Sequence, residues 1–451
     1  MNMFKYAFFI MVLLLSAAIS QAQTERPNFI LILSDDQSWK GTSVLMDPDE
    51  PESKSDYYKT PNLERLASMG MRFTNGYSPA PFCCPTRRSL QIGQFPARQN
   101  LFHEQKKIEE YYEKQPNISG TLKGIDKRYK TAHFGKWDFR SKVLTPSRLG
   151  YDESDGATGN AGGGSRDSGG PAAKEDPKRI DDVTDSACAF METCISQGNP
   201  FYVQLSHWAV HLDVYYKQET LDKVNGREKG LIHNLATFAA MTEDLDTGIG
   251  RLLDKVEELG LLENTYIIFM SDNGGRIDIP GEEPTELNAP LRSGKGSMYE
   301  GGIRVPFMIC GPGIEKGVSS DVPVSGVDLL PTMADLAGRP IQHDRLDGGS
   351  LKKLLHGESN SVLRNQDYLI FHHAITRYPQ SAIRLGDYKL VKTYEENLIE
   401  LYDLSKDFRE QNNLAKKMPE KVQELDAKLD GYLNEVKATK KYTRKKKKST
   451  K

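Results

Sequence analysis

Acidic and amide side chains follow two apolar segments that lie far apart in the chain. One segment is followed by Ser-Asp-Asp-Gln at 34–37, and the other by Ser-Asp-Asn-Gly at 271–274. Their oxygen donors are Asp35, Asp36, Asp272 and Asn273. Such hard oxygen ligands suit Ca²⁺ or Mg²⁺ rather than Zn²⁺, which favours His and Cys. Because an Asp-Asp pair after a strand is more often a turn or a helix cap, the metal site is predicted from the joint pattern.

Two further apolar segments end in basic side chains. Gly-Lys-Trp at 135–137 brings Lys136, and the segment ending at Leu205 leads into His207 and His211. Taken alone, Lys136 is most simply a solvated side chain and His207 a hydrogen-bonded core histidine. Ligands of open α/β sheets bind outside the carboxyl ends of the strands. The four segments together therefore predict one site at one edge of a sheet.

Cys83 is a candidate nucleophile. Pro85 fits the first position of a helix, so Cys83 is expected at the helix N-terminus, where free amides favour negative charge. Arg87 follows one turn later and can stabilise that charge, while Lys295 lies in a Gly-Lys-Gly loop. Two lysines, a dication and a helix N-terminus describe a pocket for a tetrahedral oxyanion. A buried pair with Cys84, or a disulfide, is the structural alternative.

The elements that must position these residues alternate between strand and helix. Continuous apolar runs, typical of strands buried on both faces, span 28–33, 201–205, 266–270 and 305–309. Helical patterns span 60–70, with Thr60 as the cap and Gly70 as the end, and 235–259. The alternation predicts an α/β sandwich around a largely parallel sheet. Short strands at 368–372, 381–385, 388–392 and 398–402, then a helix at 419–436, predict a small C-terminal antiparallel sheet.

The composition and the two ends of the chain indicate an exported globular protein. Of 451 residues, 38% are hydrophobic and 27% charged, and the net charge of -2 argues against nucleic-acid binding. The N-terminus has the pattern of an export signal cut after Ala22, and its apolar run is shorter than the roughly 20 residues of a membrane span. We expect a signal peptide at 1–22, a catalytic domain at 23–363, a C-terminal subdomain at 364–437 and a basic tail at 438–451. The mature protein is expected in the periplasm or the medium, without stable membrane insertion.

Three further features have simple structural explanations. Five cysteines are too few to frame the fold with disulfides, and Cys188 and Cys194 are poorly placed to pair along one helix. Cys310 is expected to be a small core residue. The Gly-rich segment 156–170 is predicted to be a flexible surface loop. The basic tail is most simply a solvated end, with a tether to an anionic polysaccharide as the alternative.

The segment Cys83-Cys84-Pro85-Thr86-Arg87 resembles the signature of the type I sulfatases, the formylglycine-dependent family within the alkaline-phosphatase-like superfamily. The resemblance runs from Pro27 to about Leu414 and includes the four strand-end segments and the Gly-Lys-Gly loop in the same order. In that family the first cysteine of the signature is converted to formylglycine. The resemblance implies a large mixed, mostly parallel sheet sandwiched by helices, plus a small C-terminal antiparallel sheet with one helix.

The resemblance also implies a role for each site residue. A divalent cation, usually calcium although magnesium is an alternative, would be held by Asp35, Asp36, Asp272, Asn273 and the formylglycine made from Cys83. Arg87 would hold the formylglycine, and Lys136 and Lys295 would bind sulfate oxygens. His211 matches the histidine near the leaving oxygen, whereas His207 matches a less regular position.

One position departs from the family pattern. The family usually has a histidine two places after the lysine of Gly-Lys-Trp, where this chain has Asp138. That histidine is credited with taking a proton from the formylglycine hydroxyl. Asp138 is therefore a candidate base, with replacement by another residue as the alternative.

The resemblance implies an exported sulfatase that acts on a sulfated polysaccharide or its oligosaccharides, with algal glycans as one source. Its partners would be the sulfated carbohydrate and a formylglycine-generating maturation enzyme. The residues Phe371, His372, His373, Arg377 and Tyr378 either border the pocket or are ordinary strand and surface residues. The alternatives are a phosphate monoesterase or diesterase of the same superfamily, because the same pocket would serve phosphate, and a non-catalytic binder of sulfated glycans.

Overall fold

The computed structural model describes residues 26–100, 105–163, 175–279, 287–374 and 379–440. The predicted signal peptide, Arg377, Tyr378, residues 164–170 of the Gly-rich segment and all but the first residues of the basic tail lie outside these ranges. Within the described part, no helix combines the length and the apolar character needed to cross a bilayer.

An eight-stranded mixed sheet forms the centre of the molecule, in the order β5-β4-β6-β1-β7-β8-β2-β9. Its strands are β1 (Asn28–Ser34), β2 (Gly70–Phe73), β4 (Lys130–Gly135), β5 (Glu153–Ser154), β6 (Phe201–Ser206), β7 (Thr265–Ser271), β8 (Phe307–Cys310) and β9 (Val318–Ser320). The five strands from β5 to β7 run parallel, and β8 is antiparallel to both of its neighbours. The mostly parallel sheet predicted from the apolar runs is confirmed.

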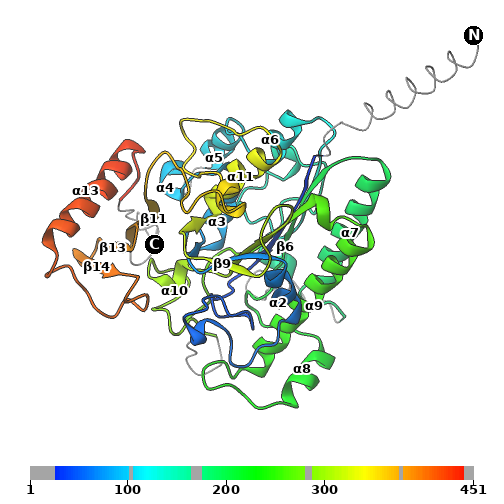
Figure 1. Cartoon of the computed structure of the whole chain (residues 1–451), viewed down its shortest axis with the longest axis horizontal. Helices are drawn as coiled ribbons and strands as arrows, with labels where there is room; N and C mark the ends of the chain where they lie inside the picture. Colours follow the sequence, from blue (N-terminus) through cyan, green and yellow to red (C-terminus); the bar gives the residue numbers. More distant parts are fainter. Residues whose placement is uncertain (1–25, 101–104, 164–174, 280–286, 375–378, 441–451) are drawn as a thin grey trace, which may run out of the picture.

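Helices cover both faces of this sheet (Figure 1). Along β1, Ile30 and Ile32 contribute to one apolar cluster, whereas Phe29, Leu31 and Leu33 contribute to another. Since side chains alternate across a strand, the two clusters lie on opposite faces. The first contains residues of α2 (Pro61–Ser68), α7 (Ile180–Ser196), α8 (Gln218–Asn225) and α9 (Ala236–Glu258). The second contains residues of α3 (Cys83–Ile92), α5 (Gln105–Tyr112), α6 (Ile118–Ile125), α11 (Leu329–Leu336) and α12 (Lys352–Leu355).

A smaller unit follows the main sheet and lies to one side of it in Figure 1. It is an antiparallel sheet of β11 (Leu369–His373), β12 (Gln380–Leu385), β13 (Tyr388–Thr393) and β14 (Leu398–Asp403), packed against α13 (Pro419–Glu435). The predicted C-terminal sheet and helix are therefore confirmed, with ends that differ by at most one residue. Short elements complete the fold: β3 (Gly76–Tyr77), β10 (Val324–Ser325), α4 (Pro96–Gln99) and α10 (Glu300–Ile303).

Several predicted ends need correction. α3 begins at Cys83, so Pro85 is its third residue rather than its first. Proline is tolerated there because the first-turn amides have no intrahelical acceptor. Thr60 precedes α2 without capping it, and the amides of Asn62 and Leu63 donate instead to the Asp246 carboxylate of α9.

Other expectations concern glycines and cysteines. Gly70 starts β2 instead of ending the preceding helix, and a side chain there would meet the Ile309 carbonyl oxygen 2.3 Å from its Cβ. Cys188 and Cys194 are both free, and Cys310 is buried in β8 as predicted. Within the Gly-rich segment, the Gly159 carbonyl accepts a hydrogen bond from the Trp208 indole, so this part is packed rather than a free surface loop.

Candidate functional site

The strand order brings the four polar segments to one edge of the sheet. β4, β6, β1 and β7 are consecutive neighbours and all run parallel. Leu33 pairs with Ser206, Gly135 also pairs with Ser206, and Ser34 pairs with Ser271. The residues that follow these positions therefore meet, as expected for the carboxyl edge of a parallel sheet.

The oxygen donors of the predicted metal site are buried and hold one another in place. The Asp36 amide donates to Asp272 Oδ1 at 3.1 Å, and Asn273 Nδ2 donates to Asp36 Oδ1 at 2.8 Å. Three of their oxygens, Asp35 Oδ1, Asp36 Oδ2 and Asn273 Oδ1, are buried with no hydrogen-bond partner among the described residues. Buried oxygens of this kind are costly unless a ligand satisfies them. The donor set therefore fits a hard divalent cation.

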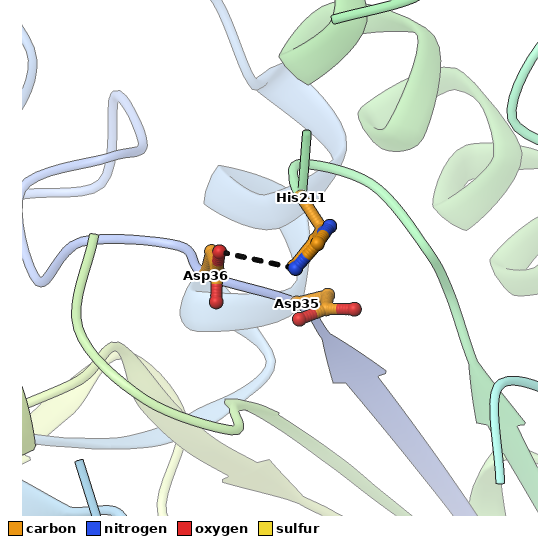
Figure 2. Close-up of side chains that lie close together, drawn as sticks. All are labelled: Asp35, Asp36 and His211. Carbon is orange, nitrogen blue, oxygen red and sulfur yellow. Dashed lines mark ion pairs between the residues drawn. The ribbon is translucent and has the colours of Figure 1, made fainter. Parts of the chain in front are cut away.

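His211 lies beside these carboxylates. Figure 2 shows its ring, on the loop that follows β6, pointing toward Asp36, with Nε2 3.8 Å from Asp36 Oδ2. One ligand atom from each of Asp35, Asp36 and His211 lies within 4.8 Å of the others, a spacing that could also hold a metal ion. His211 Nδ1 lies 2.6 Å from the Leu212 carbonyl oxygen. Because a carbonyl only accepts, Nδ1 carries a proton, and Nε2 carries one only when the ring is cationic.

Three cations balance the three carboxylates. Lys136 Nζ lies 2.5 Å from Asp35 Oδ2, Arg87 Nη2 lies 2.7 Å from Asp272 Oδ2, and Lys295 pairs with Asp36. Burial raises the pKa of Asp35, but Lys136 and the other neighbouring cations outweigh it, so the net pKa lies below its ordinary value. Burial and the Asp35 charge raise the pKa of Asp272 to about 7 against the opposing charge of Arg87. A bound dication would favour the deprotonated form of Asp272.

Cys83 is the first residue of α3 and is buried beside the same lysines. Burial raises the pKa of its thiol, and the charges of Lys136 and Lys295 oppose that effect without overcoming it. A neutral thiol is a poor nucleophile. The encoded cysteine is therefore unsuited to act directly, which agrees with a role as the precursor of another group.

Two arginines of α3 hold the turn that carries Lys136. Arg87 Nη1 donates to the Lys136 carbonyl at 2.5 Å, and Arg88 donates to the Phe139 carbonyl. Gly135 has a φ of 94°, and a Cβ there would lie 2.1 Å from the Ser206 carbonyl oxygen, so only glycine fits this close approach. The turn thus has a fixed backbone beside Cys83.

Asp138 lies in that turn, two residues after Lys136. Its Oδ2 is buried, has no hydrogen-bond partner among the described residues and lies 3.9 Å from Lys136 Nζ. Its charge is among the causes that raise the pKa of Cys83, after burial and opposite to Lys136. Asp138 thus brings an unpaired oxygen to the position where the family usually has a histidine.

The Gly-Lys-Gly loop connects the two halves of the site. The Lys295 amide donates to the Gly275 carbonyl at 2.8 Å, and the Gly296 amide donates to the Pro81 carbonyl at 2.9 Å. Lys295 is therefore anchored both to the metal-site segment and to the chain that leads into Cys83.

The comparisons with known proteins agree with this arrangement. A family model described as "Sulfatase" matches residues 27–339, more than half of the chain. The chain belongs to the sulfatase family. A second family model, described as "N-sulphoglucosamine sulphohydrolase, C-terminal", matches residues 293–439. The protein is thus a sulfuric ester hydrolase, and the resemblance read from its signature is confirmed.

Relatives of this sulfatase match it over most of their length. A sulfatase of Formosa agariphila is 28% identical over 92% of this chain and 90% of its own. An ulvan-active sulfatase of the same organism is 27% identical over 92% of this chain and 83% of its own. The solved structure of Ps i-CgsB in complex with k-i-k-neocarrahexaose has a TM-score of 0.74 at 24% identity and covers 90% of this chain and 93% of that chain. This structural likeness confirms the fold.

His207 is placed differently from the other predicted residues of this sulfatase. Both of its ring nitrogens are buried without a hydrogen-bond partner among the described residues, and burial lowers its pKa to about 4. Its amide donates to the Leu33 carbonyl at 2.9 Å, which ties it to the sheet edge. The structure therefore gives His207 a place next to the site but no contact with the carboxylates.

Two features of the site were not predicted from the sequence. Lys178 Nζ donates to the His211 carbonyl at 2.7 Å, from the segment before α7. Lys389 Nζ, in the C-terminal sheet, lies 2.7 Å from Glu300 and 2.8 Å from Glu410, and all three side chains are buried. Glu300 opens the short helix whose Gly302 carbonyl accepts from Gly274 at 3.0 Å. The C-terminal subdomain thus supports the metal-site loop from outside.

Proposed function

We propose that this protein is an exported sulfatase that hydrolyses sulfate esters of a sulfated polysaccharide or its oligosaccharides, with a formylglycine made from Cys83 and a bound divalent cation. The observation that carries the proposal is the set of buried, unpaired oxygens of Asp35, Asp36 and Asn273 beside Cys83. Family membership indicates the reaction class, which is sulfate-ester hydrolysis. These oxygens indicate where in the fold the cation and the nucleophile would meet.

The cation would be held by Asp35, Asp36, Asp272 and Asn273, with the formylglycine completing the site. Calcium suits these oxygen donors, and magnesium is the alternative. Bound together, the cation and the hydrated formylglycine would supply an acidified hydroxyl for attack on sulfur. Arg87 would hold the formylglycine from within the same helix, one turn further on.

Lys136 and Lys295 would bind the sulfate oxygens. Each ammonium lies beside a metal-site carboxylate, so both are fixed in position before substrate arrives. Preorganised cations stabilise the charge that develops on the sulfuryl oxygens without reorganisation at the moment of reaction. The two lysines come from different loops and would contact the sulfate from separate positions.

His211 would protonate the departing sugar oxygen. Its Nδ1–H is engaged by the Leu212 carbonyl, so Nε2 is the atom left to face the substrate. Nε2 holds a proton only in the imidazolium form; burial lowers the pKa of this ring, and the Asp35 and Asp36 carboxylates oppose that effect without overcoming it. Lys295, on the other side of Asp36, is the second candidate donor.

Asp138 would take the proton that the missing histidine takes in other sulfatases. Its unpaired Oδ2 supports this assignment, because an acceptor already engaged would not be free to receive a proton. Lys136 Nζ lies 3.9 Å from the same oxygen.

The substrate class and the location rest on two observations. The N-terminal sequence has the pattern of an export signal at 1–22, which would place the enzyme in the periplasm or the medium, where extracellular glycans are encountered. A relative that covers most of the chain is named as active on ulvan. We therefore assign a sulfated glycan as substrate, with algal glycans as one source, a catalytic domain at 23–363 and a C-terminal subdomain at 364–437.

Mass spectrometry of the peptide that carries Cys83 tests the proposal most directly. Protein made with a formylglycine-generating enzyme should show the mass of formylglycine at residue 83. Cys83→Ser and Cys83→Ala should both abolish sulfate release, whereas the control Cys84→Ala, at the next buried position of α3, should not. Full activity in either Cys83 variant would refute the proposal. Sulfated oligosaccharides, aryl sulfates and the matching phosphate esters, compared side by side, then test the substrate class.

A further inference from the structure

A line of alternating charges runs outward from the candidate metal site. Lys136 Nζ lies 2.5 Å from Asp35 Oδ2 and 3.9 Å from Asp138 Oδ2. On the other side of Asp138, Arg140 Nε lies 4.0 Å from Oδ1. The exposed fraction of the side chain rises from 0% for Lys136 to 10% for Asp138 and 69% for Arg140. Arg140 therefore lies where the line of charges reaches solvent.

The backbone that carries Arg140 is held in place. Arg87 and Arg88 donate to the carbonyls of Lys136 and Phe139, and Arg140 is the next residue, with a left-handed φ of 50°. Its 4.0 Å contact with Asp138 is too long for a hydrogen bond. Within the described part of the chain the Arg140 guanidinium donates no hydrogen bond, so its donors are available for another anion.

An aromatic pair lies next to the first residue of α3. Phe82 directly precedes Cys83, and its ring centroid lies 4.6 Å from that of His373 at the end of β11. His373 Nδ1 is buried without a hydrogen-bond partner among the described residues. Burial, then His372 and Arg140, lower the pKa of His373 to about 3, so the Arg140 charge acts at this ring. Apolar faces with a few polar atoms are typical linings of ligand sites.

We propose that Arg140 is a specificity-determining residue that binds a second anionic group of the substrate, either a carboxylate or a sulfate other than the one removed. The proposal rests on the proposed function, since it takes Lys136 and Lys295 as the ligands of the scissile sulfate. A guanidinium matches the planar oxygen pairs of carboxylates and sulfates. The preferred substrate is then a glycan whose sulfated sugar, or the sugar next to it, carries a further negative charge.

Kinetics on matched substrates test the proposal. Three oligosaccharides would share the same scissile sulfate and carry a neutral neighbouring group, a uronic acid or an additional sulfate. The wild-type kcat/KM should be at least about tenfold higher for one of the doubly charged substrates than for the neutral one, the gain expected of a charge-assisted hydrogen bond. Whichever of the two doubly charged substrates has the higher kcat/KM identifies the bound anion as carboxylate or sulfate. Arg140→Gln should reduce this preference to near one.

The control is Arg148→Gln, which removes another exposed guanidinium, paired with Glu113 away from the site. Its substrate preference should equal that of the wild-type enzyme. A second readout is calorimetry on the full chain with Cys83→Ala, where Arg140→Gln should weaken binding of the doubly charged oligosaccharide about tenfold. An unchanged preference in Arg140→Gln would overturn this inference and leave the proposed function intact. Absence of sulfate release from every substrate by the formylglycine-bearing enzyme would instead refute the proposed function.

Discussion

Arg87 binds Asp272 with two nitrogens of one guanidinium: Nε donates to Asp272 Oδ2 at 2.9 Å, and Nη2 lies 2.7 Å from the same oxygen. The guanidinium also donates to the Lys136 carbonyl. The buried Arg87 guanidinium therefore connects the helix of Cys83, a carboxylate of the candidate metal site and the turn of Lys136. Neither Asp272 nor Lys136 is near Arg87 in sequence.

Replacing Arg87 by Met should destabilise the protein by about 3–5 kcal/mol, because the Asp272 carboxylate would remain buried without its partner. Sulfate release, measured at a temperature where the variant is still folded, should fall by about a hundredfold or more. Urea unfolding and steady-state kinetics give the two quantities. Arg98→Met is a matched control, since Arg98 pairs with the buried Asp347 away from the metal-site residues. It should lose stability and keep its turnover, and equal loss of turnover in both variants would contradict the role of Arg87.

When divalent cations are added to protein that has first been stripped of bound metal with a chelator, its thermal stability should rise. The unpaired oxygens of Asp35, Asp36 and Asn273 gain ligation only when a cation is present. At a calcium concentration one hundred times the Kd, the expected stabilisation is about 2.7 kcal/mol. Scanning calorimetry across a calcium titration measures it, with magnesium as a parallel series.

Two variants make the calcium experiment specific. Asp36→Asn should abolish most of the calcium-dependent rise in Tm. Asp246→Asn alters a different buried carboxylate, which accepts from the first-turn amides of α2, so its Tm should fall while its calcium response remains. A wild-type protein whose Tm is indifferent to both cations would contradict the metal site.

Asp138→Asn should slow turnover by about a hundredfold, the usual contribution of a proton-transfer group. The amide keeps the shape of the side chain and loses the basic oxygen. Asp138→His, which restores the usual family residue, should recover more activity than Asp138→Asn. If Asn and His variants match the wild-type enzyme, another residue takes the proton. Pre-steady-state kinetics would show which step slows, because loss of the base should still allow a first burst of product alcohol.

The fold could be predicted from the sequence where a continuous run of apolar residues marks a strand. The runs at 28–33 and 266–270 are apolar because β1 and β7 are covered on both faces, so these runs predict both strands to within about a residue of their ends. α3 starts two residues before the predicted position, because proline suits any position of the first turn. The cap of α2 could not be found, since Asp246 supplies it from another helix.

The sequence predicts the residues of the candidate site that directly follow strands. It does not predict the buried lysines that hold the neighbouring segments in place. Asp35, Asp36, Asp272 and Asn273 each follow a strand, and strand order alone brings them together. Lys178 and Lys389 lie far from these segments in sequence and act through tertiary contacts with His211 and Glu300. No local pattern marks a lysine that will be buried against a distant carbonyl or carboxylate.

Buried histidines should make the protein acid-labile. Burial lowers the pKa of His207, His233 and His372 to about 4 and those of His133 and His373 to about 3. In the unfolded chain these groups take up protons below about pH 6.5, whereas the native state stays neutral. The stability that they contribute is therefore complete above pH 6.5 and is lost as the pH falls toward 4 for the first three and toward 3 for the other two. Each such histidine adds a slope of about 1.4 kcal/mol per pH unit to the free energy of unfolding.

His233 allows this slope to be measured one residue at a time. Its Nε2 donates to the Leu287 carbonyl, its Nδ1 bonds to Ser55 Oγ at 2.8 Å, and its ring stacks on Tyr58 outside the site. In His233→Gln the free energy of unfolding, measured by urea between pH 7.5 and 4.5, should fall less steeply than in the wild type by one proton's slope. The exposed His343 is the control, because His343→Gln removes an imidazole without changing the buried set. An equally steep fall in His233→Gln would mean that this ring takes up its proton in the native state as well.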